Sequence, residues 1–360
     1  MLAAACGGRR QEPYLTYFSP EHALTLRYPS SWKAEQAQQD GVWYRYFLAP
    51  PAGAERKPAV SVTLIAGPLG ASLDQYAQTY LAGNVVQSSR DETRPGAKGK
   101  FYLFASPDGK MRQSLLLLEE SAAARVGLPP TPPPRPAASA ASPPPAPNPK
   151  VTVRPSPTPI PTPSAPSAAP TAWVYGLYAQ GEATAFESQL PMVEEMARSL
   201  ALERPALYPE ERNPALAFSL RVPPSWRSTR TFSGGGTFVK QYTSPAFGAE
   251  KQQTVHASLT LTVEPAPGDG SAEAYRKATM DKLGEAFVVL THAPWRDGYV
   301  DVMHSETPVA VSRSRRYYRT AGGRGYSLAL EARDDIYPRV WHWCDMIAAT
   351  LEVGPEVSGP

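Results

Sequence analysis

The stretch that decides the fold is LRYPSSW at residues 26–32, which returns as LRVPPSW at residues 220–226. Three further matches follow in the same order along the chain: 41–50 with 236–245, 72–76 with 271–275, and 175–200 with 326–351. The first three matches are separated by 194 to 199 residues, and the last by 151 residues. Four matches in one order indicate the duplication of a whole domain rather than a short-period repeat.

A proline-rich stretch at residues 129–170 explains the change of offset, because the difference of 48 residues is close to its length. Proline fixes φ and lacks an amide donor, so we expect a disordered or polyproline-II spacer there. The insertion is therefore placed inside the first copy. The predicted domains are a lipobox and tether at 1–13, a first domain at 14–203 with the insertion at 122–171, a second domain at 206–353, and a flexible tail at 354–360.

Each copy has the same predicted elements. The stretch 257–263 alternates apolar and polar residues, which is typical of an antiparallel strand with one covered face. Ser72 and Gln75 form a capping box that predicts the start of a middle helix. Val340, Trp343 and Ile347 form the apolar stripe of a closing helix. The predicted fold class is α+β, with two repeated domains that are each an antiparallel sheet packed on one face by helices.

The order of elements resembles that of the PsbP-like superfamily, which includes bacterial envelope lipoproteins of the DcrB type. These elements are a strand ending in Pro-x-x-Trp, a middle helix and a closing helix. The residues that carry the resemblance are 24–32, 218–226 and the two closing helices. The resemblance covers both copies but not the insertion. It implies a small binding or assembly module without catalytic activity.

The first residues, MLAAACGG, resemble a bacterial lipobox in which Cys6 becomes the acylated first residue. The charged and apolar regions of a signal peptide are missing from the sequence as it stands. Two alternatives stay open: a start codon placed too late, or an accidental likeness. A lipidated Cys6 predicts a membrane-anchored protein of the cell envelope, in the outer membrane if the cell is Gram-negative.

Candidate site residues occur mainly in the second copy. Arg313, Arg315, Tyr317 and Arg319 share one parity, which predicts a basic and aromatic sheet face for an anionic or protein partner. An ordinary solvated face is the alternative. Cys344 lies on the apolar stripe of the closing helix and is expected to be a buried hydrophobe. The histidines have no metal-ligand spacing, so no metal or cofactor is predicted.

The leading hypothesis is a non-catalytic, lipid-anchored envelope protein that binds a protein or an anionic envelope partner. A net charge of only +3 does not favour a nucleic-acid partner. One alternative is an unanchored periplasmic or cytosolic binding module. The other is an enzyme with its site in the cleft between the domains. The absence of a Gly-x-Ser-x-Gly elbow or a recurring carboxylate pair favours binding over catalysis.

Overall fold

The computed structural model describes residues 13–20, 22–39, 42–51, 57–121, 172–248, 254–306 and 311–354. The predicted lipidation site Cys6, the proline-rich residues 122–171 and the tail beyond Gly354 lie outside the described residues. The described chain divides into two compact units. The N-terminal unit is Ser31–Arg198, and the C-terminal unit combines the described residues up to Ser30 with those from Ser199 onward.

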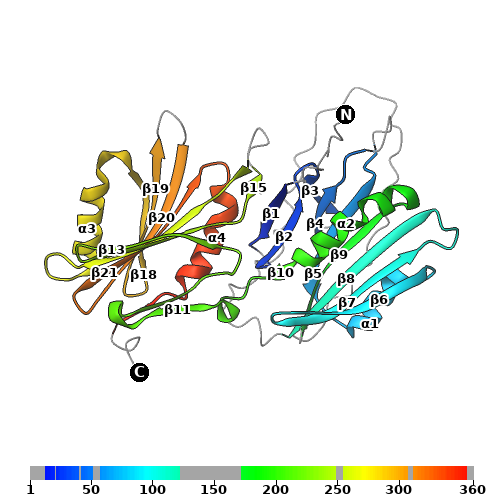
Figure 1. Ribbon diagram of the computed structural model, residues 1–360, viewed down its shortest axis with the longest axis horizontal. Helices are drawn as coiled ribbons and strands as arrows, with labels where there is room; N and C mark the ends of the chain where they lie inside the picture. The colour runs from blue at the N-terminus through cyan, green and yellow to red at the C-terminus, as the bar shows by residue number, and fades with distance from the viewer. Residues whose placement is uncertain are drawn as a thin grey trace, which may run out of the picture. The chain divides into compact units, whose positions relative to one another are not determined.

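The N-terminal unit is built on a seven-stranded antiparallel sheet in the order β3-β4-β5-β9-β8-β7-β6 (Figure 1). Its strands are β3 (Lys33–Gln39), β4 (Val42–Leu48), β5 (Val60–Pro68), β6 (Val85–Arg94), β7 (Ala97–Ala105), β8 (Met111–Ser121) and β9 (Ala172–Glu182). Strands β8 and β9 pair from Ser121 with Ala172 to Met111 with Glu182. Residues 122–171 therefore connect two adjacent strands of one sheet.

The C-terminal unit repeats this sheet in the order β13-β14-β17-β21-β20-β19-β18. Its strands are β13 (Arg227–Gly234), β14 (Thr237–Thr243), β17 (Ser258–Pro265), β18 (Val288–Trp295), β19 (Gly298–Glu306), β20 (Val311–Ala321) and β21 (Arg324–Arg333). In both sheets the last strand in the chain, β9 or β21, lies beside the third, β5 or β17. The remaining three strands continue the sheet beyond the last strand, in reverse chain order. The two topologies are identical, as a duplicated domain requires.

Each copy also contributes a small antiparallel sheet of three short strands. The first is β1 (Tyr14–Ser19), β2 (Leu24–Pro29) and β10 (Ala201–Leu202), and the second is β11 (Glu210–Asn213), β12 (Phe218–Arg221) and β22 (Glu352–Val353). A two-stranded pair joins β15 (Phe247–Gly248) and β16 (Thr254–Val255), and three 3-10 turns span Pro205–Leu207, Pro214–Leu216 and Gly284–Ala286.

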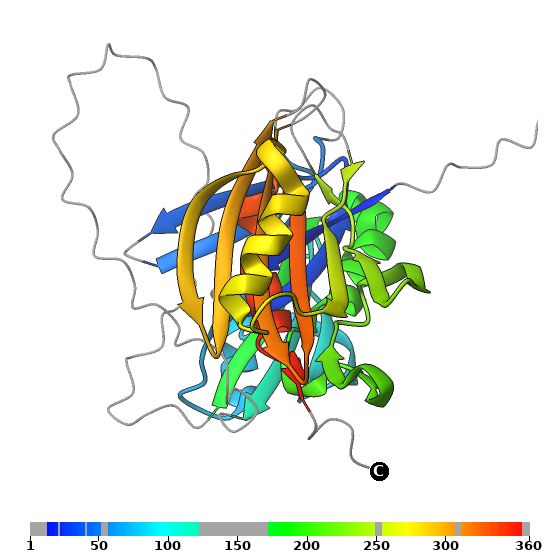
Figure 2. The same cartoon turned by 90° about the vertical axis from the view of Figure 1, so that its left-hand side faces the viewer.

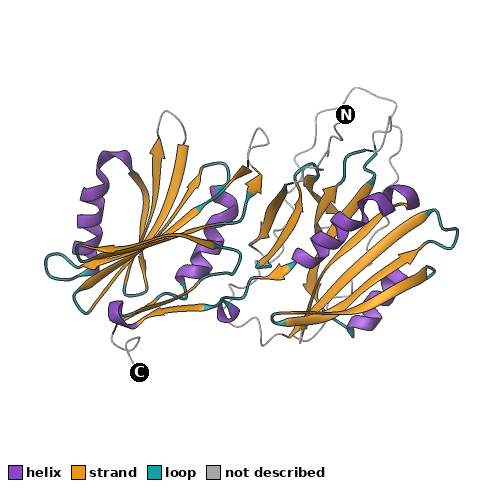
Figure 3. Cartoon of the chain, in the orientation of Figure 1, coloured by secondary structure: helices purple, strands orange, loops and turns teal. Residues whose placement is uncertain are grey.

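The described residues form four α-helices (Figure 3). They are α1 (Leu73–Leu81), α2 (Ala183–Ser199), α3 (Ala272–Leu283) and α4 (Tyr337–Ala348). The predicted capping box is confirmed, because Ser72 and Gln75 bond each other's backbone amides at 3.2 Å. No helix among the described residues is long and apolar enough to cross a membrane.

The predicted fold class, α+β with helices on one face of each sheet, is wrong. The described chain is mostly β, with 22 strands and four α-helices, and in the second copy the two helices lie on opposite faces of the sheet. In the second copy the ring of Tyr318 packs 6.3 Å from Tyr275 of α3, whereas its neighbour Tyr317 bonds Asp345 of α4. Adjacent residues of a strand point to opposite faces, so α3 and α4 sandwich the sheet (Figures 1 and 2).

The N-terminal hairpin of β1 and β2 packs with the second copy, which is why it belongs to the C-terminal unit. The ring of Phe18 stacks on Trp343 of α4, with ring centroids 5.0 Å apart and planes 12° apart. The backbone amide of Thr16 donates to the carbonyl oxygen of Ala246 at 2.7 Å. The hairpin that opens the first repeat in sequence is therefore part of the hydrophobic core around α4.

A buried carboxylate fastens this hairpin to the chain that follows β10. Glu203 is 4% exposed and accepts hydrogen bonds from the hydroxyls of Thr25, at 2.6 Å, and Tyr208, at 2.8 Å. The adjacent Arg204 is 1% exposed, and its guanidinium donates to the carbonyl oxygen of Ala23 at 2.8 Å. Burial raises the pKa of Glu203, although the two hydroxyl donors act in the opposite direction.

We predict that Glu203 makes the stability of the C-terminal unit fall with rising pH. Its pKa is higher in the folded state than in the unfolded chain, so its contribution is fully present below the unfolded pKa of about 4.3 and is lost as the pH rises through the folded value. Urea unfolding at several pH values should show a smaller loss of stability between pH 4 and 7 in Glu203→Gln than in the parent. The exposed Glu285→Gln is the matched control. An unchanged slope in Glu203→Gln would contradict this assignment.

Candidate functional site

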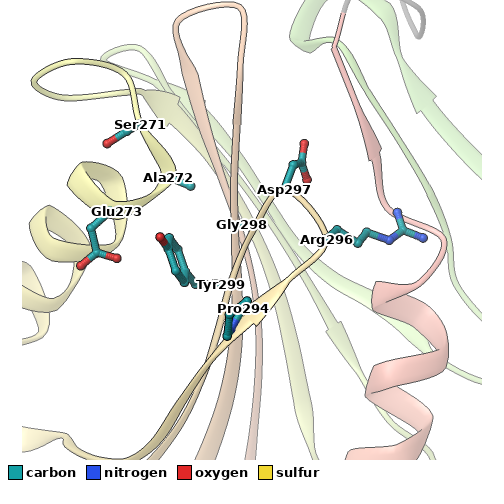
Figure 4. A pocket seen from close by; sticks show the side chains of 8 residues that line it. All are labelled: Ser271, Ala272, Glu273, Pro294, Arg296, Asp297, Gly298 and Tyr299. Atoms are coloured by element: carbon teal, nitrogen blue, oxygen red, sulfur yellow. The ribbon is translucent and has the colours of Figure 1, made fainter.

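A hollow of about 360 Å³ lies in the second copy, where the start of α3 faces the turn between β18 and β19 (Figure 4). Its lining combines carboxylate, hydroxyl, aromatic and proline side chains. The lining residues are Ser271, Ala272, Glu273, Pro294, Arg296, Asp297, Gly298 and Tyr299. Figure 4 shows the Tyr299 hydroxyl directed towards the first turn of α3, near Ser271 and Glu273.

Three of the polar lining residues are already engaged by other groups. The Ser271 hydroxyl accepts from the backbone amide of Ala274 at 3.1 Å, as the N-cap of α3. The guanidinium of Arg296 turns away from the hollow towards the end of α4 and donates to the carbonyl oxygen of Leu351 at 3.1 Å. Asp297 accepts from Arg319 at 2.6 and 2.9 Å.

The pairing with Arg319 also lowers the pKa of Asp297, chiefly through these hydrogen bonds. Glu273 is different. Its side chain is as exposed as that of Asp297, at 54% against 55%, but its ion-pair partner Arg276 stands farther away, at 3.5 Å. Glu273 is therefore the lining carboxylate with the weakest compensation of its charge.

Arg276 is held more closely by a buried aspartate beneath α3. Its Nε lies 3.0 and 2.8 Å from the two carboxylate oxygens of Asp301, which is 0% exposed. Asp301 also lies 2.6 Å from Nδ1 of His292, and the imidazole ring stacks on Tyr299 with centroids 5.0 Å apart. Tyr299 thus joins the hollow to a compact Arg276–Asp301–His292 network.

The first copy carries the opposite arrangement of charges at the same place. The β6–β7 hairpin of the first copy closes on the pair Arg94 and Ala97, and Lys100 lies three residues beyond Ala97. The β18–β19 hairpin of the second copy closes on Trp295 and Gly298, and Asp301 lies three residues beyond Gly298. Lys100 donates to Asp74 of α1 at 3.1 Å, and this hydrogen bond raises the pKa of the lysine.

The residues that pair with Lys100 and Asp301 across each hairpin also differ, one being acidic and the other basic. Asp91 pairs with Lys100, and His292 pairs with Asp301. Asp74 and Glu273 occupy the same helical position, two residues after their N-cap serines. The helix carboxylate is therefore retained in both copies, whereas the strand cation of the first copy is replaced by an anion in the second.

The arginine strand predicted as a partner-binding face lies on the α4 side of β20. Arg313 is 2.5 Å from Asp334, and Arg315 is 2.6 Å from Asp345. Tyr317 is 1% exposed and its hydroxyl donates to Asp345. Together with the Arg319–Asp297 pair, these contacts give each of the three arginines a carboxylate partner, so partner binding at this face stays a prediction.

Cys344 lies where the apolar stripe predicts it, fully buried, and burial raises the pKa of its thiol. In the part of the chain that the structure describes, no group of three or more His, Cys, Asp or Glu residues is arranged to hold a metal ion. Cys6 lies outside the described residues.

Sequence reasoning did not find the residues of the hollow. Tyr299 lies beside a WRDG turn that has no known motif, and Glu273 was one of many acidic residues on a predicted helix. The available signal was the comparison of the two copies, since Lys100 and Asp301 differ in charge at matching positions.

No family profile and no curated protein matches this chain. Among solved structures, it is similar to cyanobacterial PsbP from Synechocystis sp. PCC 6803, with a TM-score of 0.32, 14% identity, and coverage of 40% of this chain and 91% of that chain. It is also similar to the T6SS immunity protein TplEi from Pseudomonas aeruginosa, with a TM-score of 0.21, 11% identity, and coverage of 95% and 97%. A protein from Bacteroides thetaiotaomicron VPI-5482 gives a TM-score of 0.25 and 12% identity, with coverage of 41% and 48%.

We predict that removing the cation of the ion pair lowers the stability of the second copy, where the cation is Arg276, more than that of the first copy, where it is Lys100. Arg276→Met leaves the carboxylate of the fully buried Asp301 with His292 alone, so the free energy of unfolding of the C-terminal unit should fall by about 2–4 kcal/mol. The matched variant Lys100→Met removes a cation whose partner Asp74 is 70% exposed, and should change stability little. Chemical denaturation of both variants measures the difference. Equal losses would contradict the contrast between a buried and an exposed pair.

Proposed function

We propose that this protein is a non-catalytic binding or assembly module of the cell envelope, anchored to a membrane through a lipidated Cys6. The residues that support the anchor are the small side chains before Cys6 and the two glycines after it. The proposed family is that of PsbP-like domains, of the DcrB lipoprotein type. A diacylated cysteine supplies the two hydrophobic chains that durable membrane attachment needs.

The observation that carries the binding function is the hollow at the start of α3. It presents the under-compensated carboxylate of Glu273 beside the ring and hydroxyl of Tyr299. Binding is favoured over catalysis because the hydroxyl of Ser271 is committed to capping the helix, and the carboxylate of Asp301 is committed to Arg276 and His292. A lining of this kind recognises a small polar group on a partner molecule.

Mass spectrometry of the protein purified from membranes tests the anchor. The expected result is an N-terminal peptide that begins at an acylated Cys6, and a Cys6→Ser variant that moves to the soluble fraction. A chain with an unmodified thiol at Cys6 in the native membrane fraction would overturn the anchor.

Photo-crosslinking in the native cell tests the binding site. A photoreactive amino acid at Pro294, an exposed lining residue, leaves the Glu273 carboxylate in place and should give a discrete adduct, whereas the same group at Asp281, exposed on α3, should not. Asp281 lies eight residues beyond Glu273, about 12 Å along the helix. An identical pattern of adducts at both positions would contradict binding at the hollow.

A further inference from the structure

We propose that the hollow binds the ammonium group of a lysine side chain presented by a partner protein. This inference rests on the proposed binding function and specifies its ligand. It is argued from the carboxylate of Glu273, from the ring of Tyr299 and from the arrangement of the same elements in the first copy.

The first copy shows what the helix carboxylate pairs with when the fold supplies a partner. Asp74 at the start of α1 receives a hydrogen bond from Nζ of Lys100, 3.1 Å away on β7. In the second copy the matching helix residue is Glu273, and the matching strand residue is Asp301. The second copy thus has the acceptor without the lysine that satisfies it in the first copy.

The remaining cation near Glu273 is largely used elsewhere. Arg276 directs its Nε at both oxygens of Asp301, at 3.0 and 2.8 Å, and reaches Glu273 only through NH1 at 3.5 Å. Asp301 is completely buried, so this guanidinium cannot leave it without stranding a buried charge. Glu273 therefore retains most of its capacity to accept from an external cation.

The other walls of the hollow suit an alkyl ammonium ion. Tyr299, whose ring stacks on His292 on one side, offers an aromatic ring, to which a cation is attracted, and its hydroxyl oxygen is an acceptor. Pro294 and Ala272 provide apolar contact for the methylene stem of a lysine. The one cationic side chain among the lining residues, Arg296, is directed away towards the end of α4 and does not compete.

The position of Tyr299 distinguishes the two copies further. The residue directly after each closing pair of the hairpin is Tyr299 in the second copy and Lys98 in the first. An external cation would meet a second lysine in the first copy, in addition to the Lys100 that already occupies Asp74. Lysine binding is therefore expected at the second copy alone.

Titration of the full chain with N-acetyl-lysine-methylamide, followed by NMR of backbone amides, tests the proposal. Shifts should concentrate at residues 271–273 and 298–299, with a dissociation constant of roughly millimolar size, as for one exposed ion pair with an aromatic contact. N-acetyl-norleucine-methylamide, which has an uncharged side chain of similar length, should bind at least about fivefold more weakly.

Two variants give the decisive contrast. Glu273→Gln should weaken binding of the lysine amide by roughly fivefold, and Asp281→Asn, which removes the same charge from an exposed position of α3, should leave it unchanged. Unchanged circular dichroism would show that both variants are folded. Equal effects of the two variants, or equal binding of the lysine and norleucine amides, would overturn the proposal.

The outcomes also separate the ligand from the function. A specific crosslink at Pro294 without binding of the lysine amide would overturn lysine recognition and leave the binding function standing. Failure of both experiments would overturn both.

Discussion

The fold depends on burying both faces of two seven-stranded sheets. Leu115 to Leu118 form four consecutive residues of β8, and each is at most 1% exposed. Because neighbouring residues of a strand point to opposite sides, such a run requires apolar cover on both faces. Helix α1 covers the face that carries Leu115 and Leu117. The same requirement places α3 and α4 on either side of the second sheet, with β20 between them.

This two-sided burial leaves few places for chemistry. The polar residues that enter the layers must be paired, and Asp301 is held by Arg276 and His292 for that reason. In the first copy the corresponding pair is at the surface and has the reverse polarity. The two copies therefore differ in where the ion pair lies, exposed in the first and buried in the second. At the surface of the second copy, the helix carboxylate of Glu273 has no strand lysine to pair with.

Much of the organisation was predictable from the sequence, and the error in fold class has a specific cause. The repeat indicated the location of the insertion, and β8 and β9 do pair directly across residues 122–171. The stretch 257–263, where serine and threonine alternate with apolar residues, predicts a sheet covered on one face only. Those polar positions are in fact half-buried. The continuous leucine run at 115–118 was the better guide.

The candidate site was less predictable, because it depends on which partner each charge finds in space. Arg319 has a carboxylate partner in Asp297, which is not close to it in sequence. The network around Asp301 likewise joins a helix to two strands of the sheet. Such pairings depend on strand register, which single-sequence patterns do not specify when the strand is polar on one face.

Lysine recognition by the hollow is tested most directly by intermolecular NOEs between the full chain and N-acetyl-lysine-methylamide. NOEs are expected from the ε-methylene protons of the lysine to the ring protons of Tyr299, together with contacts to the side chain of Glu273. NOEs confined to other surfaces, such as the first turn of α1 around Asp74, would contradict it.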